Sequence, residues 1–405
     1  MTPTFKSSEP APTVPDFVNI PLSLIKFMGA KLFKWTPDEP RSKLQRPLLG
    51  IFCVFVSYNF LSMMLFVIYE ELETSLDITE FILFWGFALN AMMKGGTMVC
   101  FRREIESILK GLIAKHPKTE EERVAFQLVP YFRTITASNK YLSMWHLSIT
   151  SMFVLQPLVS SLLRYIWRDD KNEGYDYTLP FMMGYYYDVN QPFAYAVSYF
   201  VQCCGGFYMS MLFFSADLLL ISMVQLANMH FGYLIYKIEN FQPTGTDADI
   251  KVLGPLLKYH NEILDYAERI DSTFSLATLL NYVGSCLVIC LIGLQIVLGS
   301  DVVSVIKFIG FLVSTIAQVY CVSYFGNNLK DLSTGISDAF YNHPWYDANY
   351  KYMRMLVLPI ARAQRCAHLT AFKFFEISMD SFKSLCTTSY QFFTLLRTSI
   401  EEEDS

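Results

Sequence analysis

The C-terminal stretch from Lys373 to Arg397, KFFEISMDSFKSLCTTSYQFFTLLR, decides how the rest of the chain is interpreted. It predicts a single helix whose first half is charged and whose uncharged half covers only residues 384–396. A helix that crosses a bilayer through lipid needs about 20 apolar residues. The stretch is too short for an ordinary membrane span, so its role depends on what surrounds it.

The composition is that of a membrane protein with several spans. Of the 405 residues, 53% are hydrophobic and 17% are charged, whereas soluble domains carry about 25% charged residues. The net charge of −5 argues against a general nucleic-acid-binding surface. We therefore expect an all-α polytopic membrane protein that contacts lipid and no nucleic acid.

Six further uncharged runs have the length of a membrane span. The second is interrupted only by Lys94, whose ammonium group we expect to snorkel to a membrane interface. Asp217 directly follows the fourth run, and we expect it at the cytosolic edge of the membrane. With the C-terminal stretch, the sequence predicts seven transmembrane helices. The six runs are Leu48–Tyr69, Phe81–Cys100, Tyr141–Leu163, Pro192–Ala216, Thr273–Ser300 and Phe308–Phe325.

Basic residues predict the orientation of the chain, because Lys and Arg accumulate on the cytosolic side of membranes. Segments 1–47 and 101–140 carry seven and eight of them, whereas the loop 70–77 carries none. Segments 224–272 and 326–367 carry four and five. This alternation predicts a cytosolic N-terminus and, after seven spans, an extracellular C-terminus.

Two cytosolic segments predict a helical bundle outside the membrane. The fourth span continues with apolar residues at helical steps, namely Leu219, Met223, Leu226, Met229 and Tyr233. Residues 329–372 read as a helix, a turn at NHPWYDAN and a second helix. We divide the chain into a cytosolic segment (1–47), a six-helix membrane region (48–325), anchor helices with the seventh helix (326–397) and an acidic tail (398–405).

Signatures of enzymes are absent from the sequence, including a Gly-rich phosphate loop, HExxH and GxSxG. The six histidines lack metal-ligand spacing, so we expect no enzymatic activity, no cofactor and no metal. His146 lies in the third span, where a satisfied buried histidine is favoured over a ligand-sensing one. The run CCGG at 203–206 interrupts the fourth span, but no other span has the matching break that is typical of transporters.

A polar stripe follows one face of the uncharged half of the C-terminal stretch. Steps of three and four residues from Leu395 reach only uncharged polar side chains. Such a stripe is unfavourable against lipid. It either packs against another helix through hydrogen bonds or lines water in a pore, and the pattern leaves both open. Its members are Ser381, Ser384, Thr388, Gln391, Leu395 and Thr398.

The charged half predicts a helix end that lies outside the lipid. Lys373, Glu376, Asp380 and Lys383 recur at helical spacing, so we expect them on one helix face, with Lys373 paired to Glu376 and Asp380 to Lys383. Four charges on one face are not expected against lipid. We infer a helix that begins in the cytosolic bundle and crosses the membrane with its second half.

Three C-terminal segments resemble the insect odorant receptor family. They are SYFGNNLKDLSTGISDAFYNHPWY (Ser323–Tyr346), RAQRCAHLTAFKFF (Arg362–Phe375) and SFKSLCTTSYQFFTLLR (Ser381–Arg397). They lie in the last fifth of the chain, and the remainder agrees with the family in length, number of spans and inverted topology.

The resemblance implies an odorant-gated cation channel. In this family a tuning subunit and a shared co-receptor form a heterotetramer in the plasma membrane of olfactory sensory neurons. The seventh helix of each subunit lines the pore, and an apolar ring is the gate. The inner part of that helix lies in a cytosolic anchor domain that makes most contacts between subunits, which implies an anchor role for Lys373, Glu376, Asp380 and Lys383. The match places Leu395 at the ring, in the run Phe392–Leu395, and Ser384, Thr388, Gln391 and Thr398 along the pore wall. The loop 224–272 is shorter than in the co-receptor, so the chain is interpreted as a tuning subunit.

The resemblance also implies an outer pocket for a small volatile odorant between spans two, three, four and six. Such a pocket is mostly apolar, with a few polar groups that orient the ligand. The candidate residues are Phe84, Trp85, Leu89, Met152, Gln156, Tyr195, Tyr199, Gln202, Phe308, Phe311 and Thr315. The loop GYYYD at 184–188 is a candidate cap over the entrance.

Two alternatives stay open at this point. One is a gustatory receptor channel of the same superfamily. The other, from a different class, is a G-protein-coupled receptor. The extracellular N-terminus of such a receptor disagrees with the distribution of basic residues, and the triplet DRY is absent.

The acidic tail has two interpretations. Its carboxylates are hypothesised to concentrate cations at the pore mouth, and a solvated disordered tail is the alternative. The residues are Glu401, Glu402, Glu403 and Asp404.

Overall fold

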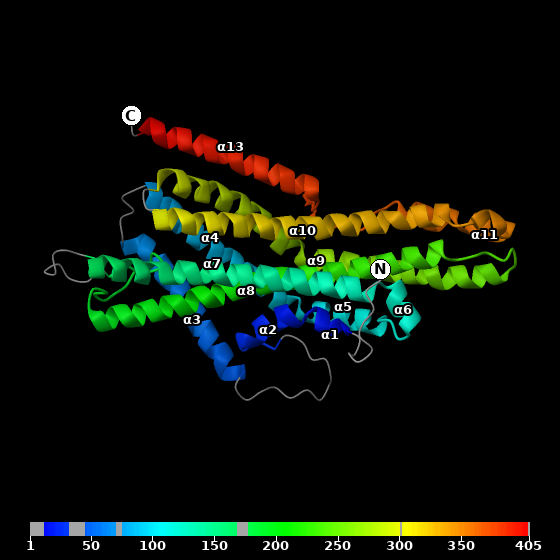
Figure 1. Ribbon diagram of the computed structural model, residues 1–405, viewed down its shortest axis with the longest axis horizontal. Helices are drawn as coiled ribbons and strands as arrows, with labels where there is room; N and C mark the ends of the chain where they lie inside the picture. The colour runs from blue at the N-terminus through cyan, green and yellow to red at the C-terminus, as the bar shows by residue number, and fades with distance from the viewer. Residues whose placement is uncertain (1–11, 32–44, 70–74, 168–176, 300–301, 404–405) are drawn as a thin grey trace.

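The computed structural model describes residues 12–31, 45–69, 75–167, 177–299 and 302–403, which form a long helical bundle with one short hairpin (Figure 1). The elements are α1 (Val14–Phe17), α2 (Asn19–Phe27), α3 (Gln45–Tyr69), α4 (Ser75–Cys100), α5 (Arg102–Ala114), α6 (Glu120–Ala125), α7 (Leu128–Trp167), α8 (Pro192–Glu239), α9 (Ala248–Leu298), α10 (Val302–Asn342), the 3-10 helix η1 (Trp345–Asp347), α11 (Tyr350–Met355), α12 (Val357–Ala363), β1 (Thr370–Ala371), β2 (Phe375–Glu376) and α13 (Met379–Glu403).

The predicted spans fall on α3, α4, α7, α8, α9, α10 and α13, although α9 ends at Leu298 and α13 begins only at Met379. Among the described residues, α3, α7, α8, α9 and α10 contain stretches long and apolar enough to cross a membrane. Consecutive long helices run in opposite directions, so the start of α8, the end of α9 and the end of α13 lie at the same end of the bundle (Figure 1). The predicted all-α polytopic architecture is confirmed.

Helix α8 forms the centre of the bundle. The predicted apolar stripe is buried at Leu219, Met223 and Leu226, but polar residues on other faces, such as Ser222 and Gln225, are buried too. A helix that is buried on all sides needs neighbours all round, and α2, α4, α7, α9 and α10 supply them. The run CCGG does not interrupt the helix, because α8 continues through residues 203–206.

The prediction of one helix over residues 373–397 is wrong at its first part. Residues 370–376 form an antiparallel hairpin in which Ala371 pairs with Phe375, and the turn places Phe372 and Lys373 at φ values of 49° and 61°. The carboxylate of Asp271 on α9 accepts hydrogen bonds from the backbone N–H and the hydroxyl of Thr370 at 2.5 and 3.0 Å. These tertiary contacts hold the segment in a conformation that its helical spacing does not predict.

The hairpin changes the predicted ion pairs. Lys373 and Glu376 do not share a helix with Asp380 and Lys383, because α13 begins only at Met379. Glu376 pairs instead with Lys330 of α10, with 2.8 Å between Oε2 and Nζ. The predicted group of four charges on one helix face is therefore wrong, whereas the charged region does connect α10 to the start of α13.

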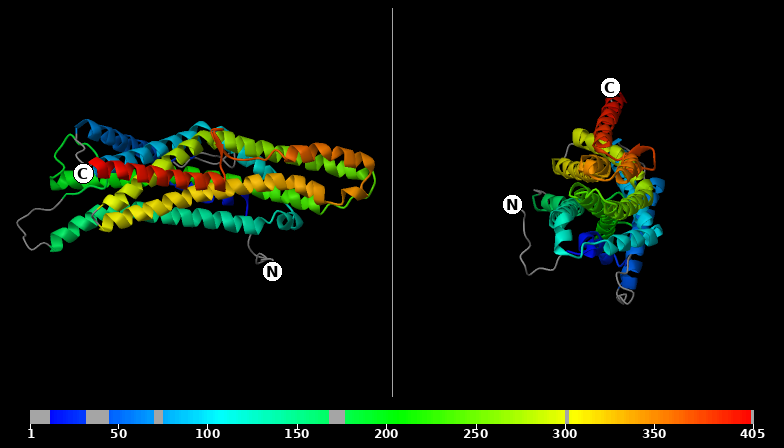
Figure 2. Two further views of the ribbon diagram at one scale, coloured as in Figure 1. Left: turned by 90° about the horizontal axis from the view of Figure 1, so that it is seen from above. Right: turned by 90° about the vertical axis from the view of Figure 1, so that its right-hand side faces the viewer.

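Helix α13 lies along the outside of the bundle, as both views of Figure 2 show. Leu385 and Ser389 are buried on the face that meets α9 and α10, and the ring of Phe393 lies against Gly293. The helix continues to Glu403, so residues 398–403 are helical rather than a disordered tail. Asp404, and the side chains of Glu401, Glu402 and Glu403, lie outside the described part of the chain.

Apart from Ser381, which is half-buried and donates to the carbonyl of Ser378, the polar stripe of α13 faces away from its own bundle. Ser384, Thr388, Gln391, Leu395 and Thr398 are all exposed, and the side chain of Leu395 is 62% exposed. Packing against another helix of the same chain is therefore not the role of this stripe.

Candidate ligand-binding site

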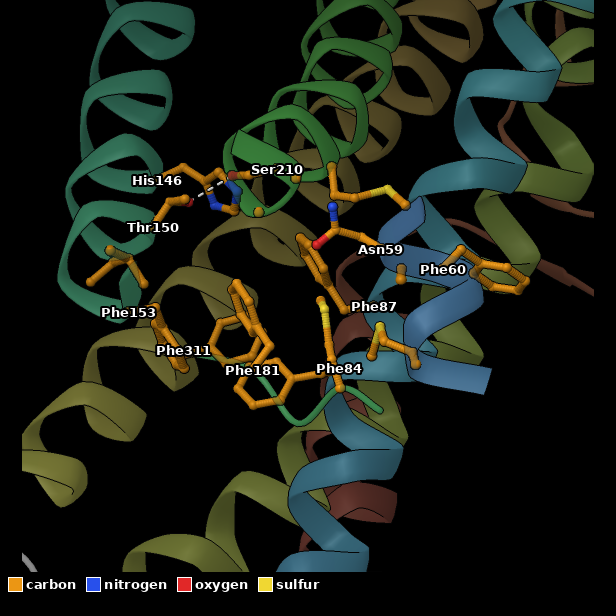
Figure 3. A pocket seen from close by; sticks show the side chains of 17 residues that line it. Asn59, Phe60, Phe84, Phe87, His146, Thr150, Phe153, Phe181, Ser210 and Phe311 are labelled. Atoms are coloured by element: carbon orange, nitrogen blue, oxygen red, sulfur yellow. Dashed lines mark hydrogen bonds between the residues drawn. The ribbon is translucent and has the colours of Figure 1, made fainter. Parts of the chain in front are cut away.

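A cavity of about 80 Å³ lies in the half of the bundle that contains the start of α8 and the end of α9, and we call it cavity one. Its walls come from α3, α4, α7, α8 and α10 and from the loop before α8 (Figure 3). The lining residues are Asn59, Phe60, Met63, Phe84, Phe87, Ala88, His146, Ile149, Thr150, Phe153, Phe181, Met183, Gly205, Gly206, Met209, Ser210 and Phe311.

The walls of cavity one are mainly aromatic. Phe84 packs edge to face against Phe153 and Phe181, with ring centroids 5.8 and 5.2 Å apart. Phe153 makes the same kind of contact with Phe311 at 5.4 Å. Figure 3 shows these rings gathered around one space. Edge-to-face packing is favourable for aromatic rings, and together they form an apolar surface suited to a small hydrophobic molecule.

Besides Asn59 on α3, the polar groups of cavity one come from α7 and α8. The hydroxyls of Thr150 and Ser210 are hydrogen-bonded at 2.6 Å. His146 lies one helical turn before Thr150 and stacks on Phe214, with ring centroids 3.5 Å apart. Its Nδ1 lies 3.4 Å from Oγ of Ser314, while its Nε2 has no hydrogen-bond partner among the described residues. The cavity thus contains polar groups of the kind that fix the orientation of a ligand.

Two glycines bring the helices close together at this cavity. A Cβ atom at Gly205 would overlap the side-chain amide of Asn59 on α3. A Cβ atom at Gly206 would lie 2.9 Å from the ring of Phe181. The run CCGG therefore serves close packing, since only glycine leaves room for these neighbours.

The loop of residues 177–191 covers cavity one and is tightly held. Gln202 accepts a hydrogen bond from the N–H of Phe181 at 2.9 Å and donates one to its carbonyl at 3.0 Å. The same amide donates to the hydroxyl of Tyr185 at 2.8 Å. The N–H of Gly184 donates to the carbonyl of Ser62 on α3 at 2.9 Å. The segment proposed as a cap therefore docks on α3 and α8 through Ser62 and Gln202.

The structure distributes the predicted ligand-binding residues over three environments. Phe84 and Phe311 line cavity one. Trp85, Leu89 and Thr315 line a second cavity between α4, α9 and α10, which Phe311 also reaches. The other six, which line neither cavity, are Met152, Gln156, Tyr195, Tyr199, Gln202 and Phe308.

Several lining residues were not predicted from the sequence. Asn59 belongs to the first span, which the sequence did not assign to the pocket, and Phe181 belongs to a loop. The spacing of His146, Thr150 and Phe153 does carry a signal, because steps of four and seven place them on one face of α7. His146 was expected to be a satisfied buried residue, but its Nε2 is unpaired within the described part of the chain.

A buried ionic cluster lies deeper in the bundle. Lys94 is 1% exposed, and its Nζ lies 2.7 Å from Oδ2 of Asp217 and 2.7 Å from Oδ1 of Asn281. Gln318 donates to the same two oxygens at 2.5 and 3.0 Å. The expectation that the ammonium group of Lys94 snorkels to an interface is wrong, because it is buried inside the bundle against the carboxylate of Asp217.

The comparisons with known proteins agree with this architecture. The chain is 25% identical to Odorant receptor 67c of Drosophila melanogaster over 405 residues, which cover 96% of this chain and 97% of that protein. It is 34% identical to Odorant receptor 85b of the same species over 221 residues, or 54% of this chain and 57% of that protein.

A solved structure shares the fold. The olfactory receptor OR5 from Machilis hrabei, solved in complex with eugenol, superimposes with a TM-score of 0.80 at 13% identity, covering 95% of this chain and 98% of that one. The family model described as 7tm Odorant receptor matches residues 76–390. Since this match covers well over half of the sequence, the chain belongs to the 7tm odorant receptor family.

Proposed function

We propose that this chain is an odorant-tuned receptor subunit that binds a small volatile molecule in cavity one and opens a cation-conducting pore lined by α13. Membership of the odorant receptor family makes the chain a sensory receptor of the membrane and not an enzyme. The observation that carries the pore assignment is the exposure of the polar stripe of α13 on the outside of its own bundle.

The chemistry of this stripe suits a pore wall. Ser384, Thr388, Gln391 and Thr398 offer uncharged polar groups to water, and Leu395 interrupts them with one apolar side chain. A ring of such leucines from several subunits would close a polar pore by excluding water. Lining a pore requires further subunits around a common axis, and a co-receptor subunit is the proposed partner.

A small organic ligand is supported by the character of cavity one and by the related fold. The olfactory receptor from Machilis hrabei was solved with eugenol. The volume of about 80 Å³ in the present structure is below the range of about 300–1,000 Å³ that is usual for ligand pockets. We therefore propose that ligand binding pushes the aromatic walls apart.

Helix α10 is the proposed link between the ligand and the pore. It carries Phe311 at cavity one and Tyr320 further along, whose ring packs edge to face on Phe382 of α13 at 5.6 Å. Beyond that point Lys330 holds the hairpin before α13 through Glu376. A displacement of α10 by the ligand would therefore act on α13 at two places.

The proposed location is the plasma membrane of olfactory sensory neurons, with the N-terminus in the cytosol. The alternation of basic segments supports this orientation. Tags at the two termini, probed with and without permeabilisation of the cell, test it: the C-terminal tag is expected to react on intact cells. Reaction of the N-terminal tag on intact cells would contradict a cytosolic N-terminus and support a rhodopsin-like topology.

The test of the function is a current recording from cells that express the full chain with the odorant co-receptor. A panel of small volatile alcohols, phenols and esters is applied, and at least one is expected to evoke a cation current. Ser210→Ala removes the hydroxyl that bonds Thr150 and should shift the concentration of half-maximal response. Ser215→Ala, a buried serine of the same helix that does not line the cavity, is the matched control and should leave it unchanged. Equal shifts in both variants would contradict the role of cavity one.

A further inference from the structure

A second cavity, which we call cavity two, has a volume of about 490 Å³ and is lined mainly by α4, α9 and α10, with His146 of α7 and Phe213 and Phe214 of α8. This volume falls within the usual range for ligand pockets, about 300–1,000 Å³. Its inner end is reached by Gln318, the amide that donates to Asp217 in the buried ionic cluster. Most of its lining is apolar, and the residues of α9 that line it run from Leu280 to Leu291.

Cavity two is separated from cavity one by a wall of three side chains. Phe87, His146 and Phe311 line both cavities. The ring of Phe87 lies 6.1 Å from that of Phe311 and 4.8 Å from that of Phe213. The two spaces therefore share a partition but have different walls, and α9 contributes only to cavity two.

The mouth of cavity two opens on the outer surface between α4 and α9. Ile82 and Leu89 of α4 line it and are 45% and 40% exposed, and Leu287 of α9 is 53% exposed. These apolar side chains lie in the outer half of the bundle, at the depth of the predicted spans, where the surrounding medium is hydrocarbon. A molecule that dissolves in the bilayer reaches this opening without crossing the loops that cover cavity one.

Trp85 and Asn90 line cavity two, and each carries a buried polar atom without a partner in the described part of the chain. Nε1 of Trp85 and Oδ1 of Asn90 each have no hydrogen-bond partner within the described residues, although both atoms are shielded from solvent. An indole N–H needs an acceptor, and an amide oxygen needs a donor. Leaving either unpaired in an apolar environment is costly. A hydroxyl group can serve as donor or as acceptor, so it fits either atom.

We propose that cavity two is a second ligand site, which takes a small apolar molecule bearing a hydroxyl group and is entered from the bilayer. An acyl chain of a lipid would fill the apolar part but leave Trp85 and Asn90 unpaired. The site is independent of the pore assignment, because it rests on the walls, the mouth and the two unpaired atoms alone.

The experiment uses the full chain in lipid nanodiscs and two photoreactive probes of equal length, an aliphatic alcohol and the corresponding alkane, each bearing a diazirine. After irradiation, the labelled residues are identified by mass spectrometry. The alcohol is expected to label the walls of cavity two on α4 and α9 more strongly than the alkane. Equal labelling by both probes, or no labelling there, would overturn the proposal.

A plugging variant and a matched control locate the label. Gly86 lines cavity two, and a Cβ atom there meets no atom within 4 Å, so Gly86→Phe places a ring in the cavity without a backbone clash. Gly96 is also in α4 with open space around it but lines neither cavity. Labelling should fall to background in Gly86→Phe and persist in Gly96→Phe. Persistence in both variants would place the label on the lipid-facing surface and contradict the site.

A third variant tests the hydrogen bond itself. Trp85→Phe keeps an aromatic ring but removes the N–H, so labelling by the alcohol should drop toward that by the alkane, while labelling by the alkane stays the same. If the alcohol still labels more strongly than the alkane in both Trp85→Phe and Asn90→Leu, neither unpaired atom is the hydrogen-bond partner of the bound alcohol. Odorant-evoked currents are not the readout, so failure of the second site and failure of the proposed receptor function are distinguishable.

Discussion

Lys94 and Asp217 form an ion pair inside the helical bundle, with 2.7 Å between Nζ and Oδ2 and each residue almost fully buried. The ammonium group also lies 3.4 Å from the ring centroid of Phe213. The pair joins α4 to α8, and Asn281 and Gln318 extend it to α9 and α10. Because ionisable groups are costly at membrane depth unless paired, this cluster fixes how four helices pack below the two cavities.

Removing one charge of this pair should destabilise the receptor strongly. Lys94→Met leaves Asp217 buried without its counterion, and breaking a buried pair in this way costs about 3–5 kcal/mol. Removing both charges in Lys94→Met/Asp217→Leu should recover much of the loss. The measurement is thermal unfolding of the purified full chain in detergent.

Lys110→Met is the matched control for the buried pair. Lys110 pairs with Glu106 at 2.6 Å on the surface of α5, where its side chain is 54% exposed. Exposed pairs of this kind contribute about 0.3–0.5 kcal/mol. If Lys94→Met lowers the thermal stability as little as Lys110→Met does, the buried pair does not hold the four helices together.

Gly205→Ala should disturb the packing of α3 on α8. The added Cβ would overlap the side-chain amide of Asn59, which donates to the carbonyl of Phe55 at 2.7 Å. Overpacking of this kind costs about 1–3 kcal/mol, so both thermal stability and ligand response should fall. Gly50→Ala, in the same bundle but with no atom within 4 Å of the new Cβ, should have neither effect. Equal behaviour of the two variants would refute the close-packing role of Gly205.

The hairpin before α13 predicts a dependence of stability on pH. The hydrogen bond from Lys330 lowers the pKa of Glu376 below its ordinary value. A carboxyl group whose pKa is lower in the folded state stabilises the fold above its unfolded value of about 4.3, and this contribution is lost as the pH falls through the folded value. Both side chains are 40–45% exposed, so the contribution is below about 1 kcal/mol.

Glu376→Gln tests this dependence directly. The variant should be less stable than the wild type at neutral pH, and the difference should shrink in acid as the wild-type carboxylate is protonated. Thermal midpoints of both proteins are measured across this pH range in the same detergent. A difference that stays constant with pH would mean that the charge of Glu376 does not contribute.

The spans were predictable from the sequence because uncharged runs of about 20 residues have few other uses. The ion pair of Lys94 with Asp217 was not predictable, because the two residues are 123 positions apart and only the fold brings them together. The hairpin was missed for a local reason. Phe372 and Lys373 adopt left-handed φ values that usually call for glycine or asparagine, so the sequence contains no turn signal there.

Cavity one was only partly predictable. Phe84 and Phe311 could be placed because the order of the spans indicates which helix ends face outward. Asn59 could not be predicted, because its side chain reaches the cavity only through the space that Gly205 leaves on α8. Trp85 and Leu89 have the right helix and depth but point to cavity two, because neighbouring positions on a helix face different directions.

Leu395→Ser should raise the current in the absence of odorant. The exposed side chain of Leu395 is the proposed apolar constriction, and a hydroxyl there would weaken the exclusion of water. Recording basal current from the variant with the co-receptor checks this. Leu396→Ser, one residue off the stripe, is the control and should leave the basal current low. A basal current unchanged in Leu395→Ser, or raised equally in both, would remove Leu395 from the gate.

The most direct test of the pore asks whether the exposed stripe of α13 meets the permeating ions. Thr388 lies on the stripe and is exposed, whereas the next residue, Ser389, is fully buried against the bundle. In a Cys386→Ser background, Thr388→Cys and Ser389→Cys are expressed with the co-receptor, and a cationic thiol reagent is applied during the odorant-evoked current. If α13 lines the pore, the reagent blocks the current of Thr388→Cys and spares that of Ser389→Cys. An unblocked current in Thr388→Cys, or equal block in both variants, would contradict the assignment of α13 as the pore-lining helix.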